Sequence, residues 1–234
     1  AKVAGQIPIT IHEATSYPFD ETLRFTLTFP DKKRQSATFP FHFRIPSWCQ
    51  QAAITLNGKS FDAGAVTNGI ATINRQWKQG DQLTVTFPAE VNASYWYDGA
   101  AVIERGPLVY ALKMQERWTR KKMDDSQQVR YGSWYYEVTS DSPWNYCLSG
   151  NQLRADQIAA HFRFEKRDIG NKYPWTAEAP VVIKAKGRRI PNWQLYKGSA
   201  GPVNYTSQEG EPLGEEEAIE LIPYGCTTLR ITEF

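Results

Sequence analysis

Histidine and cysteine are scarce in this chain, which has three of each among 234 residues. Metal centres and most nucleophile–base pairs draw on clusters of these residues together with carboxylates. The cysteines, Cys49, Cys147 and Cys226, are far apart in the sequence and form no C-x-x-C pair. We therefore expect no metal site, no cofactor and no catalytic residue in this chain. We expect three buried free thiols, with a single disulfide as the alternative.

Long hydrophobic runs are also lacking. One of the longest, Ala179–Ile183, is far shorter than the roughly 20 apolar residues that a membrane-spanning helix needs. The formal net charge is only +2, which provides no strong field for nucleic acid or an anionic membrane. Residues 117–122 contain four basic side chains, but aspartates follow at 124 and 125. Mixed charge is typical of solvated surfaces. We interpret the cluster as a solvated loop, with a nucleic-acid site as the alternative, and expect neither nucleic acid nor membrane as a partner.

Aromatic residues, by contrast, are plentiful, with eight Trp, twelve Tyr and eleven Phe, and many occur in strand-like runs. Apolar side chains recur at every second position over 23–29 and 39–45, which is the pattern of half-buried strands. Asn57-Gly58 is a strong hairpin signal, and 78–81 has turn composition. Many short strands separated by turn residues predict an all-β fold of two consecutive antiparallel β-sandwich, jelly-roll-like domains.

The spacing of the predicted strands changes at Pro88–Asn92, which marks a domain boundary. We predict a first β-sandwich domain over 1–90 and a second, with long loops, over 91–234. The strands expected in the second domain are 100–103, 108–112, 134–138, 181–185, 219–222 and 229–231. One short helix is expected at 155–160.

Two kinds of candidate site residue stand out. Glu104-Arg105 precedes a Gly-Pro turn, where the carboxylate could be a general acid or, as we favour, part of a structural ion pair. Aromatic triplets occur at 95–97 and 134–136, and neighbours on a strand point to opposite faces, so each triplet should present a ring outward. The candidate sugar-stacking residues are Trp96, Tyr97 and Trp134. The alternative is that these rings pack on a partner domain or a loop.

Seven motifs follow one another along the chain. They are Thr15–Asp20, Phe43–Cys49, Leu56–Gly58, Ile73–Asp81, Glu104–Tyr110, Ser142–Tyr146 and Ile222–Cys226. This ordered set covers almost the whole chain and resembles the C-terminal part of the β-L-arabinofuranosidase family of glycoside hydrolases, formerly a domain of unknown function.

The resemblance implies a longer parent protein, in which an N-terminal (α/α)6 barrel precedes two β-sandwich domains. The family's active site lies in that barrel, with a zinc-ligating Cys nucleophile and a Glu acid/base, and none of those motifs occurs in this sequence. The chain would then be a non-catalytic accessory region, inactive alone, of an enzyme acting on arabinofuranosyl-containing plant glycans. It would brace the missing barrel and mediate domain or subunit contacts.

The partners that the resemblance implies are the barrel of the same polypeptide, a second copy in a homodimer, and a plant polysaccharide or oligosaccharide substrate. It also implies a periplasmic or extracellular location for the parent. The alternative is a stand-alone carbohydrate-binding module that uses its exposed aromatics. A self-sufficient hydrolase would need two carboxylates converging in one cleft.

Overall fold

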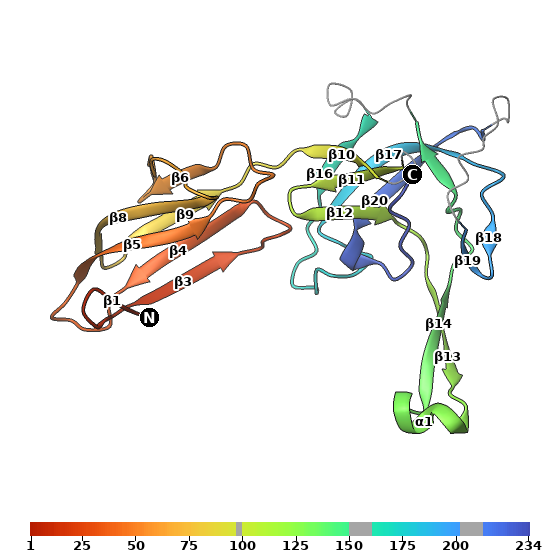
Figure 1. Cartoon of the computed structure of the whole chain (residues 1–234), viewed down its shortest axis with the longest axis horizontal. Helices are drawn as coiled ribbons and strands as arrows, with labels where there is room; N and C mark the ends of the chain where they lie inside the picture. The colour runs from red at the N-terminus through yellow and green to blue at the C-terminus, as the bar shows by residue number, and fades with distance from the viewer. Residues whose placement is uncertain (97–99, 150–160, 202–212) are drawn as a thin grey trace. The chain divides into compact units, whose positions relative to one another are not determined.

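The computed structural model describes residues 1–96, 100–149, 161–201 and 213–234. They form two compact units, Ala1–Glu90 and Val91–Phe234 (Figure 1). Strands make up nearly all of the regular structure, and every strand pair is antiparallel, so the predicted all-β sandwich class is confirmed. Among these residues, no helix has the length and apolar character needed to cross a membrane.

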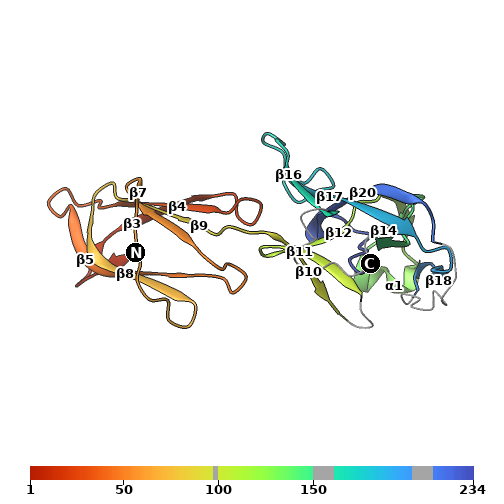
Figure 2. The ribbon, with the colours of Figure 1, turned by 90° about the horizontal axis from the view of Figure 1, so that it is seen from above.

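The first unit is a sandwich of two sheets. A five-stranded sheet runs in the order β3-β4-β9-β6-β7, a second sheet pairs β5 with β8, and β1 and β2 form a small ribbon (Figure 2). The strands are β1 Lys2–Val3, β2 Ile7–Pro8, β3 Thr10–Thr15, β4 Thr22–Thr28, β5 Ser36–Arg44, β6 Ala53–Leu56, β7 Lys59–Ser60, β8 Ile70–Lys78 and β9 Gln82–Thr86.

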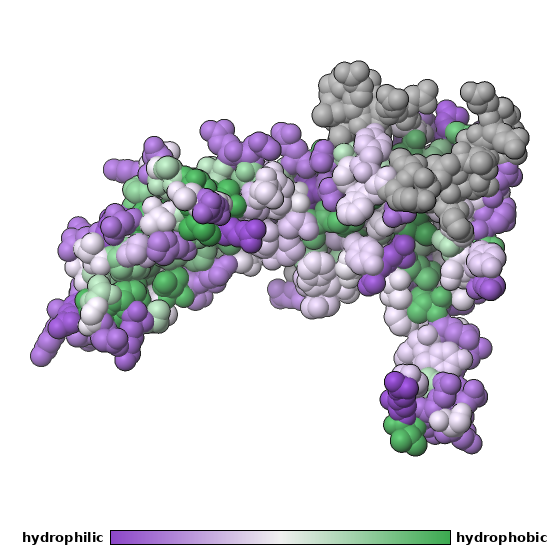
Figure 3. Space-filling view, viewed as in Figure 1, coloured by the Kyte–Doolittle hydropathy of each residue, from purple (hydrophilic) through white to green (hydrophobic). Residues whose placement is uncertain are grey.

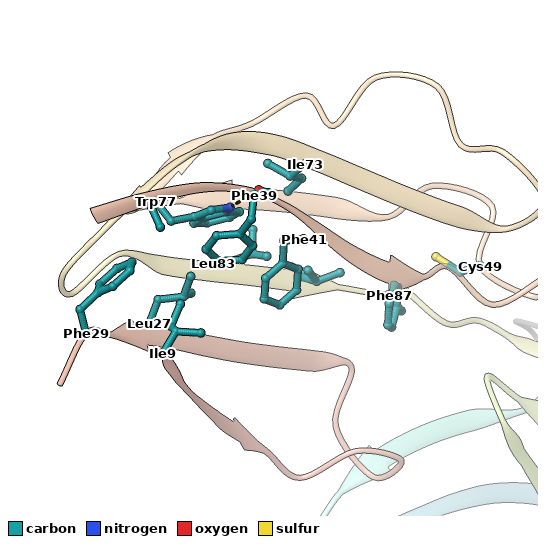
Figure 4. Packing of buried hydrophobic residues seen from close by; sticks show 12 residues of the cluster. Ile9, Leu27, Phe29, Phe39, Phe41, Cys49, Ile73, Trp77, Leu83 and Phe87 are labelled. Atoms are coloured by element: carbon teal, nitrogen blue, oxygen red, sulfur yellow. Dashed lines mark hydrogen bonds between the residues drawn. The ribbon is translucent and has the colours of Figure 1, made fainter. Parts of the chain in front are cut away.

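Trp77 of β8 lies in the core between these sheets and is fully buried (Figure 4). Its indole packs against Phe39 and Phe41 of β5, at ring-centroid distances of 5.9 and 5.6 Å. Its Nε1 donates a 3.0 Å hydrogen bond to the carbonyl oxygen of Phe39. Leu27 and Leu83 close the core from the five-stranded sheet. A large aromatic cluster with its one polar atom satisfied therefore holds the two layers together.

Strand β5 alternates between the two environments as its sequence predicts. Phe39 and Phe41 are buried, whereas Pro40, His42 and Arg44 are exposed. Because side chains of a strand point alternately to its two faces, the phenylalanines enter the core and the polar residues face water.

The hairpin between β6 and β7 turns at Asn57-Gly58, whose φ angles are +52° and +78°. Asparagine and glycine tolerate this left-handed conformation, and type I′ turns require it at both central residues. The predicted hairpin is therefore confirmed.

The second unit is built on a seven-stranded sheet with the order β10-β11-β12-β20-β17-β15, in which β16 also pairs with β17. Its strands are β10 Val91–Tyr95, β11 Ala101–Arg105, β12 Leu108–Leu112, β15 Tyr146–Leu148, β16 Arg163–Lys166, β17 Val181–Arg189 and β20 Glu216–Pro223. A short pair, β18 Leu195–Tyr196 and β19 Ser199–Ala200, and the 3₁₀ helix η2 Tyr224–Cys226 complete it. The buried side chains of β12, β17 and β20 form the centre of its core.

A two-stranded arm, formed by β13 Arg117–Lys122 and β14 Trp134–Thr139, is separate from this sheet. The helix α1 Asp125–Tyr131 joins the two strands at the tip (Figure 1). The solvated loop predicted around 117–125 is therefore wrong in its structure, although these side chains are exposed as expected. The mixed charge of this segment correctly indicated exposure to solvent, but it does not indicate whether the backbone pairs with another strand.

Two further predictions concern the end of the chain and the expected helix. Residues 229–231 do not form a strand, although the amide of Leu112 donates a 2.8 Å bond to the carbonyl oxygen of Ile231. The predicted helix at 155–160 lies outside the described residues. The segment after η2 thus runs beside β12 with a single bond rather than a ladder.

The three cysteines are free thiols, as predicted. Cys49 and Cys226 are buried, but Cys147 is only half-buried because it lies on β15, the last strand of the sheet order. Burial raises the pKa of all three thiols, to about 11 for Cys226.

Candidate functional site

The arm separates its side chains into two chemically different faces. Strands β13 and β14 pair over six positions, from Arg117 opposite Thr139 to Lys122 opposite Trp134. Residues directly opposite each other share a face, and successive residues alternate. The first set, here called the aromatic face, is Trp118, Arg120, Lys122, Trp134, Tyr136 and Val138. The second, called the ion-pair face, is Arg117, Thr119, Lys121, Tyr135, Glu137 and Thr139.

The rings of the aromatic face contact one another while remaining open to solvent. Trp118 meets Tyr136 edge-on, with ring centroids 5.8 Å apart. The guanidinium carbon of Arg120 lies 4.3 Å from the ring centroid of Trp134. The exposed fractions of Trp118, Tyr136 and Trp134 are 54%, 57% and 49%. In Figure 3 the arm accordingly shows pale surface of intermediate hydropathy between hydrophilic areas.

Most charges of the arm are neutralised on the other face. Lys121 Nζ lies 3.3 Å from Glu137 Oε2, and Arg117 forms an ion pair with Asp141, just after β14. On the aromatic face, within the part of the chain that the structure describes, Arg120 has no carboxylate within ion-pair distance. The aromatic face therefore combines exposed rings with a positive charge that the arm itself does not neutralise.

A cavity of about 810 Å³ lies at the foot of the arm. Its walls come from three segments, 113–118, 175–178 and 225–230, so that Trp118 belongs to both the cavity and the aromatic face. Its volume is within the range typical of ligand sites.

Glu116 lines this cavity, but its carboxylate is occupied by hydrogen bonds within the protein. Its Oε1 accepts hydrogen bonds from Thr227 Oγ1 at 2.8 Å and from the backbone amides of Thr228 and Leu229, while its Oε2 accepts one from Trp118 Nε1 at 3.1 Å. Burial acts to raise the pKa of Glu116, but these four donors outweigh it and lower the pKa. A glycosidase general acid needs a raised pKa, so Glu116 does not suit that role. Glu178, the other glutamate that lines this cavity, is exposed.

A second cavity, of about 410 Å³, lies beside the Ser142–Tyr146 motif. The rings of Trp144 and Trp193 meet edge-on at 5.0 Å. Asn145 Nδ2 donates to the carbonyl oxygens of Ile190 and Trp193, and its Oδ1 accepts from Arg189 Nε at 2.7 Å. Because both hydrogens of the Asn145 side-chain amide are used internally, this side chain fixes the fold of the loop rather than offering hydrogen bonds to a ligand.

The structure does not gather the sequence-predicted site residues at one place. Trp134 lies on the arm, whereas Trp96 follows β10, is 63% exposed, and bonds through Nε1 to Ser94 Oγ. Tyr97 lies outside the described residues. Arg105 stacks on the Phe164 ring at 3.7 Å, and the role of the Glu104-Arg105 pair stays a prediction.

Sequence reasoning missed Trp118, Arg120 and Tyr136. The sequence of each strand carries no alternation that would separate these side chains, and only the cross-strand register shows that they share a face. Among the described residues no group of three or more His, Cys, Asp or Glu side chains could hold a metal ion. The zinc that the family resemblance implies therefore does not fit the residues described here.

Solved structures with this fold include a GH127 beta-L-arabinofuranosidase from Geobacillus stearothermophilus T6. It is 25% identical with a TM-score of 0.58, over 96% of this chain and 29% of its own. Two others have TM-scores of 0.49: a glycoside hydrolase at 21% identity (96% and 31% of the chains) and the GH127 beta-arabinofuranosidase BT3674 at 16% (93% and 29%). This chain thus spans about three-tenths of the length of the structures it matches. No curated protein sequence matches it.

The similarity to the Geobacillus stearothermophilus structure shows that this chain has the fold of a β-sandwich region found in a glycoside hydrolase. More particularly, residues 1–89 match the family model for the beta-L-arabinofuranosidase GH127 middle domain. The first unit is therefore similar to this GH127 domain, and the family resemblance predicted from the motifs is confirmed.

Proposed function

We propose that this chain is the non-catalytic accessory region of a glycoside hydrolase that acts on arabinofuranosyl-containing plant glycans. The observation that carries this proposal is the match of residues 1–89 to a middle domain, together with a GH127 relative of which the chain covers only 29%. A catalytic (α/α)6 barrel in the remainder of the polypeptide would supply the chemistry, including any zinc. A homodimer contact would be a further role of the same region.

The bracing role has a physical basis in the two units. Each buries its own apolar core, with fully buried residues such as Trp77 in the first and Ile183 in the second. A rigid sandwich can hold a neighbouring domain because packed interiors deform little. The contacts between region and barrel would then make the two unfold together.

Calorimetry on the longer polypeptide tests this role. We expect the barrel and this region to unfold in one transition, and Trp77→Ala to lower its midpoint as a whole. If calorimetry instead shows two separate transitions, and Trp77→Ala lowers the midpoint of only one of them, this region does not brace the barrel. The 234-residue chain alone should not hydrolyse a chromogenic β-L-arabinofuranoside. Turnover that is lost in Glu178→Gln and kept in Glu13→Gln would overturn the accessory assignment.

A second candidate function is glycan binding by the chain itself. The observation that favours it is the aromatic face, where Trp118, Tyr136 and Trp134 remain about half exposed. Large aromatic side chains carry much contact energy and usually become covered. Titration calorimetry with arabinose-containing oligosaccharides tests this function, and the absence of heat at millimolar ligand would exclude it.

A further inference from the structure

We infer that the aromatic face of the arm binds an acidic oligosaccharide, a glycan chain that carries carboxylates on its sugar units. This inference rests on the second candidate function and specifies its ligand class. It joins two properties of one surface, its exposed rings and its positive charge.

The rings provide the contacts for the sugar faces. Trp118 and Tyr136 lie edge to face, 5.8 Å apart, each more than half exposed. Trp118 is held in place because its Nε1 donates to Glu116, which is itself fixed by the 227–229 loop. Two χ angles are all that an aromatic side chain loses on binding, so the ordering cost is small.

The charge provides the selectivity. Arg120 is directly opposite Tyr136 in the register, and its guanidinium is packed on Trp134 at 4.3 Å. A guanidinium held in this way can present its N–H fork to a carboxylate. Trp134, which the sequence suggested as a sugar contact, is then a positioning residue, because it orients Arg120.

Lys122 adds a second cation at the next position of the same face. Its Nζ lies 3.8 Å from Asp125, but both side chains are largely exposed, at 67% and 92%, so this pair is weak. A carboxylate on the ligand can therefore compete for Lys122. A neutral glycan offers these cations only hydroxyl and ether oxygens, without the stronger charge-assisted bond to a carboxylate.

The same face suits nucleic acid and protein less well. Residues 117–141 contain five basic and four acidic side chains, so the arm lacks the excess of cations that phosphate binding draws on. Lysine is depleted from the cores of protein interfaces, whereas Lys122 shares this face with the rings. Both alternatives are outcomes of the experiment below.

Isothermal titration of the full chain with oligogalacturonate, and with a neutral arabino-oligosaccharide of equal length, tests the inference. The acidic ligand should bind at least about tenfold more tightly, since a charge-assisted hydrogen bond contributes roughly that factor. Its affinity should fall as salt is raised, because the cations are exposed.

Matched variants use the two faces of the arm. Arg120→Gln and Tyr136→Ala should each weaken oligogalacturonate binding by roughly tenfold. Lys121→Gln and Tyr135→Ala, on the ion-pair face, should leave the affinity unchanged. Circular dichroism establishes that each variant is folded before it is titrated.

Four results would overturn the inference. Equal binding of neutral and acidic ligands would keep glycan binding and remove the selectivity. No binding of either would remove the second candidate function as well, while leaving the accessory role to its own calorimetric test. Equally tight binding of polyglutamate or single-stranded DNA would show a response to charge alone. A dimer in sedimentation that Tyr136→Ala dissociates would show that the face contacts a second copy.

Discussion

Asn57 Nδ2 donates a 2.9 Å hydrogen bond to Oδ1 of Asp81, a buried carboxylate on a neighbouring turn. The other oxygen, Oδ2, accepts from the backbone amide of Lys78 at 2.9 Å and lies 3.7 Å from Arg75 Nη2. Asn57 Oδ1 in turn accepts from the amide of Gln82 at 2.8 Å. One carboxylate thus ties the β6–β7 hairpin to the turn between β8 and β9.

Replacing this carboxylate should destabilise the protein. We expect Asp81→Ala to lower the free energy of unfolding by about 2 kcal/mol, because two partly buried hydrogen bonds, from the Lys78 amide and the Asn57 side chain, lose their charged acceptor. Urea denaturation measures it. Asp62→Ala, which removes an exposed aspartate that caps the amide of Gly64, should change the value by less than about 0.5 kcal/mol. Equal losses in both variants would contradict the role given to Asp81.

The core of the first unit should depend strongly on Trp77. Trp77→Ala should cost about 4 kcal/mol, since it opens a large cavity between the sheets and leaves the Phe39 carbonyl oxygen without its donor. Trp77→Phe should cost less and serves if the alanine variant does not fold. Trp96→Ala, at an exposed position, is the matched control and should change the urea midpoint little.

Stability should fall in acid partly through Glu116. Burial acts to raise its pKa, but the donors on Thr227, Thr228, Leu229 and Trp118 lower it below its ordinary value of 4.5. A lowered folded-state pKa contributes stability that is complete above about pH 4.5 and is lost as the pH falls through the folded pKa. Glu116→Gln should therefore flatten the acid limb of a plot of unfolding free energy against pH. Glu13→Gln should not, because that side chain lies outside this network.

The thiols should differ in their reactivity. Cys147 is half-buried and should react first with a thiol reagent such as DTNB, whereas the buried Cys49 and Cys226 should react only on unfolding. Because burial raises the pKa of Cys147 as well, its reaction should be slow at neutral pH and faster as the pH rises. Cys147→Ser should remove the first phase. A first phase that persists in this variant would contradict the assignment.

The tip of the arm should be an early site of proteolysis within the described residues. Helix α1 buries none of its residues, and Val129 is fully exposed. A two-stranded ribbon is marginally stable without further packing, so local opening should expose the bond after Arg130 to trypsin. Mass spectrometry of a brief digest should show this cleavage, and Arg130→Gln should abolish it. Earlier cleavage after Arg75, on the packed strand β8, would contradict the expectation.

Local patterns were sufficient to predict much of the first unit. Strands that are half-buried alternate in hydrophobicity, as in 39–45, and Asn57-Gly58 has few conformations open to it other than a tight hairpin. The arm could not be predicted in this way. Both of its faces are exposed, so burial imposes no period, and residues 117–122 looked like a charged loop.

The candidate site was only partly predictable for the same reason. Trp134 was suggested by its own strand, but Trp118, Arg120 and Lys122 of the aromatic face come from a second strand twelve or more residues away. Which residues of two strands share a face depends on their register, and register is a property of the paired structure. At 229–231 the error was the reverse: the sequence predicted a strand, but the segment makes only one of the backbone hydrogen bonds that a strand needs.

Lys122 lies directly opposite Trp134, and this register decides which side chains of β13 and β14 share a face of the arm. A one-residue insertion in β13 between Arg120 and Lys121, with Lys122 still opposite Trp134, would keep the hairpin, yet it would move Trp118 and Arg120 to the face of Tyr135 and Glu137. Trp118 would then be separated from Tyr136, and Arg120 would share a face with Glu137. Whether a residue belongs to the aromatic face therefore depends on whether its position along the strand is odd or even. An insertion or deletion of two residues should preserve this face better than one of a single residue.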